Sequence, residues 1–308
     1  MNHVDIKGVF CAALAYLLWG LFPLYWKMLD QIAALDILAH RIVWSCVFMC
    51  GVLLFLKQWQ VGMKALKSLL GNKKALVSLL CSTILISINW FVYIWAVGHG
   101  HILEASLGYY INPLVSIVLG IVFLKERLSR MQTGAVLIAA IGVLISAFQY
   151  GSVPYIALIL AFTFGLYGLV KKRTTLTSAI GLTLETIMIT PVALFFLLFY
   201  SHSWYSAASS DPKIWLLLFL AGVLTAIPLL LFSEGAKKLP LYQIGILQYI
   251  APTITLCLGV FVYHEPFNSG KAFTFSCIWA ALILFTFSQF NWNKRTKLLL
   301  KRKNAHHS

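Results

Sequence analysis

The chain has 308 residues, of which 60% are hydrophobic and 11% charged, and its mean hydropathy is +0.86. A soluble domain is roughly 45–50% apolar and about 25% charged, so a soluble enzyme, a disordered tail and a secreted scaffold all fit this composition poorly. The net charge of +15 would suggest a nucleic-acid partner in a soluble protein. The six cysteines lie within apolar runs without a CxxC pair, which indicates small buried thiols and neither disulfides nor metal ligands.

Apolar runs of about 20 residues, the length that a helix needs to cross a bilayer, occur ten times along the chain. The first run follows Lys7 but has no small-residue cleavage site, and Trp19 and Trp26 stand where cleavage would occur. We therefore interpret it as a spanning helix and not as a signal peptide. The predicted spans are residues 8–28, 35–56, 75–97, 102–124, 132–150, 154–170, 178–200, 213–233, 241–263 and 271–290.

Lysine and arginine are concentrated in alternate loops. If the N-terminus is cytoplasmic, 20 of these residues lie in cytoplasmic segments and 3 on the opposite side. This bias explains the basic charge without nucleic acid, and it predicts that both termini, including the basic tail of residues 294–308, are cytoplasmic. We interpret the tail as a solvated end near anionic lipid. Glu234 precedes Lys238 by four residues at the cytoplasmic rim, which predicts a surface ion pair.

The chain contains an internal repeat. Residues 74–126 align without a gap with residues 213–265 when the sequence is shifted by 139 positions. Proline, glycine and glutamate in shared register are harder to obtain by chance than matching apolar residues. The matched pairs include Pro113 with Pro252, Gly120 with Gly259, and Glu126 with Glu265.

Each copy of the repeat contains five spans, and because five is odd the second copy enters the membrane from the opposite side. The sequence thus predicts an all-α polytopic membrane protein of ten transmembrane helices, arranged as two inverted five-helix repeats over residues 1–150 and 151–293. We expect Glu126 and Glu265 to anchor loops on opposite faces. Inverted repeats are typical of secondary transporters, with the substrate site near the midplane at the repeat interface.

Short motifs within the spans extend over nearly the whole chain. They are Trp19-Gly20 with Pro23, His40-Arg41, Asn89-Trp90, Trp95-Ala96, the run from Leu103 to Leu114, the run from Tyr167 to Val170, and Gln248-Tyr249-Ile250 with Pro252. This set resembles the EamA family of the drug/metabolite transporter superfamily, and within it the RarD-type permeases.

The resemblance implies a ten-helix inner-membrane exporter or permease with a central cavity between two five-helix halves. RarD-type proteins are associated with chloramphenicol resistance. The chain departs from the family pattern where His264-Glu265-Pro266 replaces the usual Gly-Glu, and Ala251 stands where the first repeat has Asn112.

Prolines inside the spans remove an amide donor and free the carbonyl four residues earlier, which must find a partner in lipid. Pro113 and Pro252 occupy equivalent positions, so we expect them to kink the fourth and ninth spans symmetrically and to permit gating. The carbonyls of Tyr109 and Gln248 would then face a cavity. The alternative for each proline is a packing kink that a neighbouring helix satisfies.

Arg41 and Glu185 are the most deeply placed ionisable residues, and such residues are functional candidates by default. At ~1.5 Å per residue, Arg41 lies about 9–10 Å from the outer end of its span and Glu185 about 10–12 Å from the cytoplasmic end of its own. We hypothesise that they pair or share a polar network across the pseudo-twofold axis, with Glu185 as a proton-coupling group. The alternative is that Arg41 extends outward to Asp36 and water, while Glu185 only forms hydrogen bonds.

Other polar groups lie near the outer ends of the spans. His40 follows Asp36 by four residues, so it either titrates near neutral pH or is a satisfied helix-end histidine. Glu104 begins the fourth span, where it either stabilises the positive end of the helix dipole or stands at an outer cavity mouth. His99 and His101 lack a third ligand, so we predict no metal site and no cofactor.

Aromatic and amide side chains accompany the polar and kinking residues. Ring faces combined with amide and hydroxyl groups suit an amphipathic organic solute, although helix packing is an equal explanation for each residue alone. The predicted substrate-binding residues are Tyr16, Trp19, Asn89, Trp90, Tyr93, Tyr109, Asn112, Gln248 and Tyr249.

The sequence therefore predicts a secondary transporter of the inner membrane that moves a metabolite, an amino acid or an amphipathic, chloramphenicol-like drug by alternating access, as an exporter and with proton coupling as one option. Its partners are the small solute and membrane lipids. The competing function is a membrane-embedded enzyme acting on a lipid-soluble substrate, but no HExxH, GxSxG or P-loop motif is present. A passive channel would usually build its polar ring by oligomeric symmetry.

Overall fold

The computed structural model describes residues 5–99, 101–150, 153–201, 211–264 and 269–305. Within these ranges every regular element is a helix. Ten of the described helical segments are long and apolar enough to cross a membrane, which confirms the predicted number of spans and the fold class.

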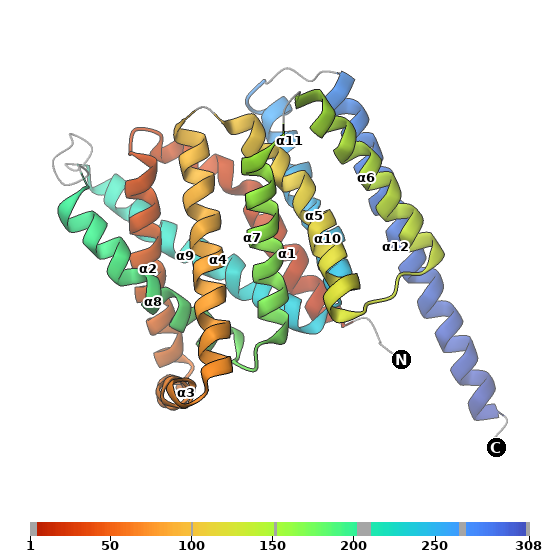
Figure 1. Cartoon of the computed structure of the whole chain (residues 1–308), viewed down its shortest axis with the longest axis horizontal. Helices are drawn as coiled ribbons and strands as arrows, with labels where there is room; N and C mark the ends of the chain where they lie inside the picture. The colour runs from red at the N-terminus through yellow and green to blue at the C-terminus, as the bar shows by residue number, and fades with distance from the viewer. Residues whose placement is uncertain (1–4, 100, 151–152, 202–210, 265–268, 306–308) are drawn as a thin grey trace.

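The helices stand side by side in a wide bundle, with both chain ends toward the same side (Figure 1). The first half of the chain contains α1 (Ile6–Trp26), the 3-10 helix η1 (Lys27–Leu29), α2 (Ala34–Phe55), α3 (Trp59–Gly71), α4 (Lys73–Gly98), α5 (Ile102–Leu124) and α6 (Arg130–Tyr150). The second half contains α7 (Tyr155–Arg173), α8 (Ser178–Phe199), α9 (Pro212–Lys238), α10 (Leu241–Gln248), α11 (Ile250–Phe261) and α12 (Ser269–Ala305).

Helices are the expected response of an apolar chain in lipid, because each backbone donor and acceptor is then satisfied within its own segment. Polar side chains satisfy the first free amides at several starts. Asp5 accepts a hydrogen bond from the amide of Gly8 at 2.8 Å, and Asp211 accepts one from Lys213 at 2.8 Å. These caps fix where α1 and α9 begin.

The helix α3 lies outside the predicted spans. It is seen nearly end-on in Figure 1, whereas α2, α4 and α7 run down the page, so it lies across the end of these spanning helices. Lys64 and Lys67 share this helix with the exposed apolar side chains of Val61 and Met63. A polar, basic face beside an apolar one is typical of a helix that rests in the membrane interface.

The ninth span is divided into α10 and α11 at Tyr249, three residues before Pro252, whereas α5 continues through Pro113. The amide of Tyr249 bonds to the carbonyl of Ile246, a tighter turn than an α-helix makes. The helix is therefore interrupted close to Pro252 and continuous at Pro113, so the local structure at these equivalent positions differs.

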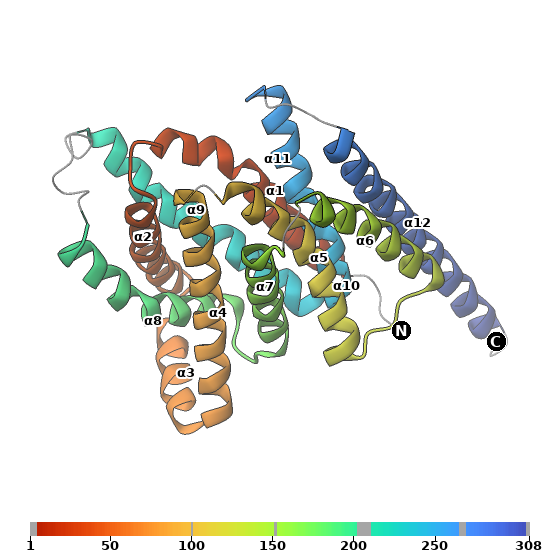
Figure 2. The same cartoon turned by 45° about the horizontal axis from the view of Figure 1, so that its top comes forward.

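Helices of one half pack mainly against helices of the other. α5 packs on α7 as α1 packs on α10 and α11, and α4 packs on α7 as α1 packs on α9. Three further large contacts, α2 with α8, α5 with α10 and α6 with α12, join helices at corresponding positions of the two halves, whereas α2 packs on α9 more extensively than α8 packs on α4. This exchange of equivalent contacts is consistent with a pseudo-twofold relation, and Figure 2 shows helices from both halves alternating along the bundle.

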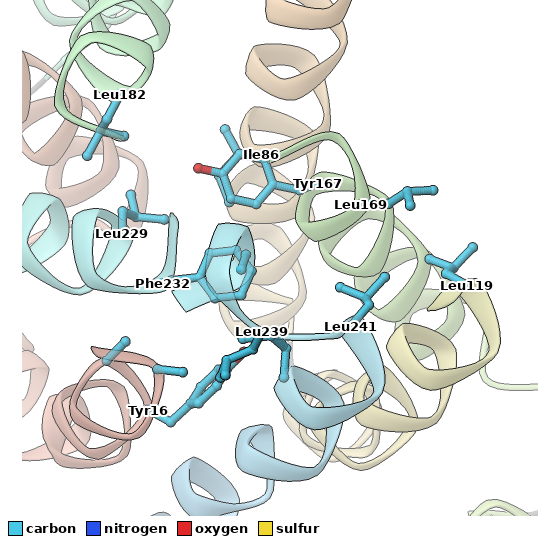
Figure 3. Close-up of a cluster of buried hydrophobic side chains, with 14 of the residues drawn as sticks. Tyr16, Ile86, Leu119, Tyr167, Leu169, Leu182, Leu229, Phe232, Leu239 and Leu241 are labelled. Carbon is cyan, nitrogen blue, oxygen red and sulfur yellow. The ribbon is translucent and has the colours of Figure 1, made fainter. Parts of the chain in front are cut away.

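A cluster of buried hydrophobic side chains, here called the interhalf core, lies where both halves meet (Figure 3). Tyr167 of α7 stacks on Phe232 of α9 with ring centroids 5.9 Å apart, and Tyr16 of α1 meets the same phenylalanine edge-on at 6.2 Å. Further residues come from α4, α5, α8 and α10, and again from α7, α9 and the C-cap of α9; the labelled ones are Ile86, Leu119, Leu169, Leu182, Leu229, Leu239 and Leu241.

The contact between α2 and α9 is the tightest approach to a glycine in the described bundle. A Cβ atom on Gly222 would lie 2.4 Å from the backbone carbon of Trp44. The hydroxyl of Ser45 donates to the carbonyl of Gly222 at 2.9 Å across the same contact. The missing side chain of Gly222 thus lets α9 lie directly against α2.

We expect Gly222→Ala to destabilise the protein, by about 1–3 kcal/mol, because the added methyl group overpacks a contact made with backbone. Thermal unfolding in one detergent, followed by tryptophan fluorescence, measures the effect. Gly51→Ala is the matched control, since a Cβ there meets no atom within 4 Å. Equal melting temperatures for the two variants would contradict the assigned contact.

Candidate functional site

Glu185 of α8 forms a buried ion pair with Lys171 of α7. The lysine Nζ lies 2.7 Å from Oε1, and the two side chains are 2% and 4% exposed. Ser82 of α4 donates to the same oxygen at 2.5 Å, and Tyr167 donates to Oε2 at 3.3 Å. Three spanning helices thus meet at one carboxylate.

The hypothesis that Glu185 pairs with Arg41 is wrong, because the ion-pair partner of Glu185 is Lys171. Depth explains the outcome. Two residues that each lie about 10 Å from opposite faces of a ~30 Å core are separated by about 10 Å along the membrane normal. The inverted relation that makes Arg41 and Glu185 equivalent also keeps them apart.

Lys171 was not predicted as a site residue because it begins the run Lys171-Lys172-Arg173, which is typical of a cytoplasmic loop. The helix α7 continues through all three residues. Only Lys171 turns inward; Lys172 donates to the carbonyl of Leu239, and Arg173 donates to that of Phe123 at 2.7 Å. The other two cations therefore satisfy carbonyls at or near the ends of neighbouring helices.

A small pocket lies beside the ion pair. Lys171 and Glu185 form part of its wall, and the α7–α8 loop closes another part. The remaining lining residues are Ser78, Leu79, Ser82, Val170, Thr174, Leu176 and Gly181.

Arg41 of α2 is also buried, at 9% exposure, but its surroundings differ. Its Nε donates to the hydroxyl of Thr225 on α9 at 3.0 Å, which the close α2–α9 contact makes accessible. The guanidinium carbon lies 4.8 Å from the ring centroid of Trp26 and 5.4 Å from that of Trp90. The alternative in which Arg41 extends to Asp36 is also not observed, since no ion pair joins them in the described structure.

Three of the predicted substrate-binding residues gather around Arg41. Trp90 and Tyr93 come from α4 and Tyr109 from α5. The rings of Tyr93 and Tyr109 meet edge-on at 5.8 Å, and both lie close enough to Arg41 for a charge on either phenol to act on it. Tyr109 is 47% exposed. We call Arg41, Trp26, Trp90, Tyr93, Tyr109 and Thr225 the arginine cluster.

Tyr16 and Trp19 lie elsewhere, in the interhalf core. Trp19 meets Phe164 of α7 at 5.6 Å and Phe232 of α9 at 5.8 Å, so it joins the first helices of the two halves. The hydroxyl of Tyr16 is buried without a hydrogen-bond partner in the described structure.

The other predicted binding residues divide into bonded and unbonded groups. Asn89 donates to the carbonyl of Leu160 and to the hydroxyl of Thr163, both at 2.9 Å, and thereby fastens α4 to α7. Tyr249 is fully buried and donates to the carbonyl of Tyr110 at 3.4 Å. In the last two of these residues a buried side-chain oxygen, Oδ1 of Asn112 and Oε1 of Gln248, lacks a partner among the described residues.

Glu104 and Glu126, near the two ends of α5, bind the starts of two other helices. The Oε1 atom of Glu104 accepts a hydrogen bond from the amide of Ile156 on α7 at 2.7 Å. Glu126 accepts from the amides of Leu241 and Tyr242 on α10 at 2.7 and 3.0 Å. These carboxylates stabilise the positive ends of the helices against which α5 packs. Glu104 lies in the first turn of its own helix, as predicted, and in addition binds the start of α7. Glu265 lies outside the described residues.

The remaining polar predictions have local explanations. His40 is buried with its ring edge-on to Trp215 at 5.6 Å. His99 stacks on Trp95, and the described residues contain no group of three potential metal ligands. The predicted ion pair between Glu234 and Lys238 is confirmed at 2.8 Å.

Comparison with known proteins gives a consistent result. The profile of the EamA-like transporter family matches residues 6–148 and 152–287. An uncharacterized transporter, YojE, of Bacillus subtilis is 68% identical over 96% of this chain and 99% of its own. Protein RarD of Escherichia coli is 42% identical over 94% and 97%, and the chloramphenicol-sensitive protein RarD of Pseudomonas aeruginosa is 28% identical over 92% and 94%. One solved crystal structure shares the fold, with a TM-score of 0.69 at 19% identity over 92% of this chain and 98% of the other.

We expect Lys171→Met and Glu185→Leu each to destabilise the protein, by about 3–5 kcal/mol, because each leaves its partner charged, buried and unpaired. The double variant should recover most of this loss. Thermal unfolding of the four proteins gives the coupling between the two residues. Lys238→Met is the control, since that pair is partly exposed and is expected to contribute only about 0–1 kcal/mol. Additive losses at Lys171 and Glu185 would contradict the ion pair.

Proposed function

Because the chain belongs to the EamA-like transporter family, we propose that this membrane transporter is a secondary carrier, which exports a small organic solute across the inner membrane by alternating access. The two inverted halves are the supporting feature. Most large contacts between the halves occur in equivalent pairs, as in carriers whose inverted halves move against each other so that the site opens to either side of the membrane.

The single observation that carries the proposal is the placement of two buried charged sites at different depths. Arg41 of the arginine cluster lies near the start of α2, on the predicted outer side. The Lys171–Glu185 pair lies near the end of α7, on the predicted cytoplasmic side. The aromatic side chains of the interhalf core lie on the helices that connect them. A buried charge in a membrane helix is costly and usually marks a substrate or ion pathway.

The proposed orientation places both termini and α3 on the cytoplasmic side. The lysines of α3 and the excess of basic residues in the loops at that end support it. Single cysteines at Ser308 and Asp211, introduced separately into a cysteine-free background, provide the test. A membrane-impermeant maleimide added to spheroplasts should label the Asp211→Cys protein alone, and labelling of Ser308→Cys instead would reverse the assignment.

Proton coupling at Glu185 is the second part of the proposal. Lys171, Ser82 and Tyr167 face this carboxylate from α7 and α4, and the charge of Lys237 on α9 also acts on it. Protonation of Glu185 would neutralise one member of the ion pair and weaken the link between α7 and α8. A water molecule in the pocket beside the pair would be able to deliver a proton to Glu185.

The solute class remains part of the proposal. The aromatic side chains near Arg41 favour an amphipathic organic molecule. One relative carries chloramphenicol sensitivity in its name, so amphenicols belong in the first panel, together with amino acids and other metabolites. A membrane enzyme is the competing function, and it predicts chemical change of the solute where a carrier predicts none.

Flux measurements in proteoliposomes test the proposal. We expect saturable, substrate-selective movement of unmodified solute that increases under an imposed pH gradient. Glu185→Gln should lose the dependence on the gradient, because an amide cannot take up the proton. Glu234→Gln is the matched control, since this carboxylate lies in the Glu234–Lys238 pair, and it should retain the dependence. Absence of flux from folded protein, or conversion of the solute, would overturn the carrier assignment.

A further inference from the structure

Arg41 carries a buried positive charge without a carboxylate partner. No acidic side chain among the described residues lies within 4 Å of its nitrogens, and the three ion pairs of the described structure involve other residues. Its one hydrogen bond, to Thr225, uses Nε. The two Nη atoms bond to no described group, and neither is among the fully buried unpartnered atoms, so each keeps some surface that the protein does not cover.

The environment positions this guanidinium without neutralising it. Trp26 and Trp90 lie within cation–π distance of it, at 4.8 and 5.4 Å, and Thr225 fixes its Nε edge. Aromatic rings and a hydroxyl orient the charge but supply no counter-ion. Since an unpaired charge inside a membrane protein is costly, this arrangement is suited to the reversible binding of an anion.

We propose that the arginine cluster binds the carboxylate group of an amphipathic, aromatic or aliphatic organic acid, which is the transported solute. The two Nη donors form a planar fork that matches the two oxygens of a carboxylate. Tyr93 and Tyr109, whose rings meet at 5.8 Å, add hydroxyl groups close to the same charge, and the protein leaves 47% of Tyr109 uncovered. The rings of Trp90 and Tyr109 can hold the apolar part of the acid.

Charge favours a monoanion over a phosphate. Arg41 is the single cation that the described contacts bring into the cluster, whereas a doubly charged phosphate is usually held by several donors or cations. Lys27, next to Trp26 in the sequence, lies over the ring of Tyr263 at 4.3 Å. This inference rests on the proposed transport function, of which it specifies the solute class.

Equilibrium binding to the purified full-length chain in nanodiscs tests the inference. The probe is tritiated 3-phenylpropionate, with unlabelled 3-phenylpropionate, 3-phenylpropionamide and 2-phenylethylphosphonate as competitors of the same shape. We expect saturable binding, with the carboxylate at least tenfold stronger than the amide and stronger than the phosphonate. Equal competition by the amide, stronger competition by the phosphonate, or no saturable binding would overturn the proposal.

Variants assign the binding to Arg41. Arg41→Gln should abolish the preference for the carboxylate over the amide, and Arg41→Lys should weaken carboxylate binding at least tenfold because an ammonium lacks the planar fork. Thr225→Val leaves the charge in place and should weaken binding a few-fold, so the test survives if Arg41→Gln does not fold. Arg130→Gln, at the exposed start of α6, should bind like the parent protein. Unchanged affinity in both Arg41→Lys and Thr225→Val would overturn the assignment.

Measurements of solute flux distinguish a failure of the carboxylate-site inference from a failure of the proposed transport function. Saturable transport of uncharged amphenicols without any carboxylate preference would leave the carrier standing and remove the carboxylate site. Carboxylate binding that depends on Arg41, without flux of any solute, would support the site and remove the carrier.

Discussion

Lipid cannot hydrate a charge or a backbone amide, and this constraint decides how the helices of the bundle are joined. This constraint acts most strongly on the Lys171–Glu185 pair, because burying either charge without the other would cost several kcal/mol. Ser82 and Tyr167 complete the coordination of the carboxylate, so α4, α7 and α8 must meet at one place. The position of these three helices is thus set by a polar requirement as much as by apolar packing.

The same constraint explains the role of α5 as a connector. With one carboxylate near each end, at Glu104 and Glu126, this helix binds the starts of α7 and α10, which both belong to the other half of the chain. Each bond satisfies amides that would otherwise have no partner at a helix start. The halves are therefore joined near both ends of α5 by charged groups and between them by the interhalf core.

Span number, fold class and the Glu234–Lys238 pair could be predicted from the sequence, because each depends on local pattern and length. The helix α3 was missed since its 13 residues are too few and too polar for a span. Lys171 was missed because a run of three cations gives no sign of which one turns inward. The Thr225 partner of Arg41 depends on the bare backbone at Gly222, which lets α2 and α9 touch. A contact between segments so distant in sequence is not encoded in either span alone.

The exchange of contacts between the halves has a consequence for biosynthesis. A ribosome makes the chain from its N-terminus, so α1, α2, α4 and α5 enter the bilayer before the helices against which they pack exist. At that stage three residues of the first half lack the hydrogen-bond partners that they have in the native bundle. These partners are Thr225 for Arg41, Glu185 for Ser82 and the start of α10 for Glu126. The nascent first half must persist as separate inserted helices, whose polar side chains face lipid, water at the interface or the insertion machinery. Assembly of the native bundle is accordingly a late event, completed only after α9 to α12 have been synthesised.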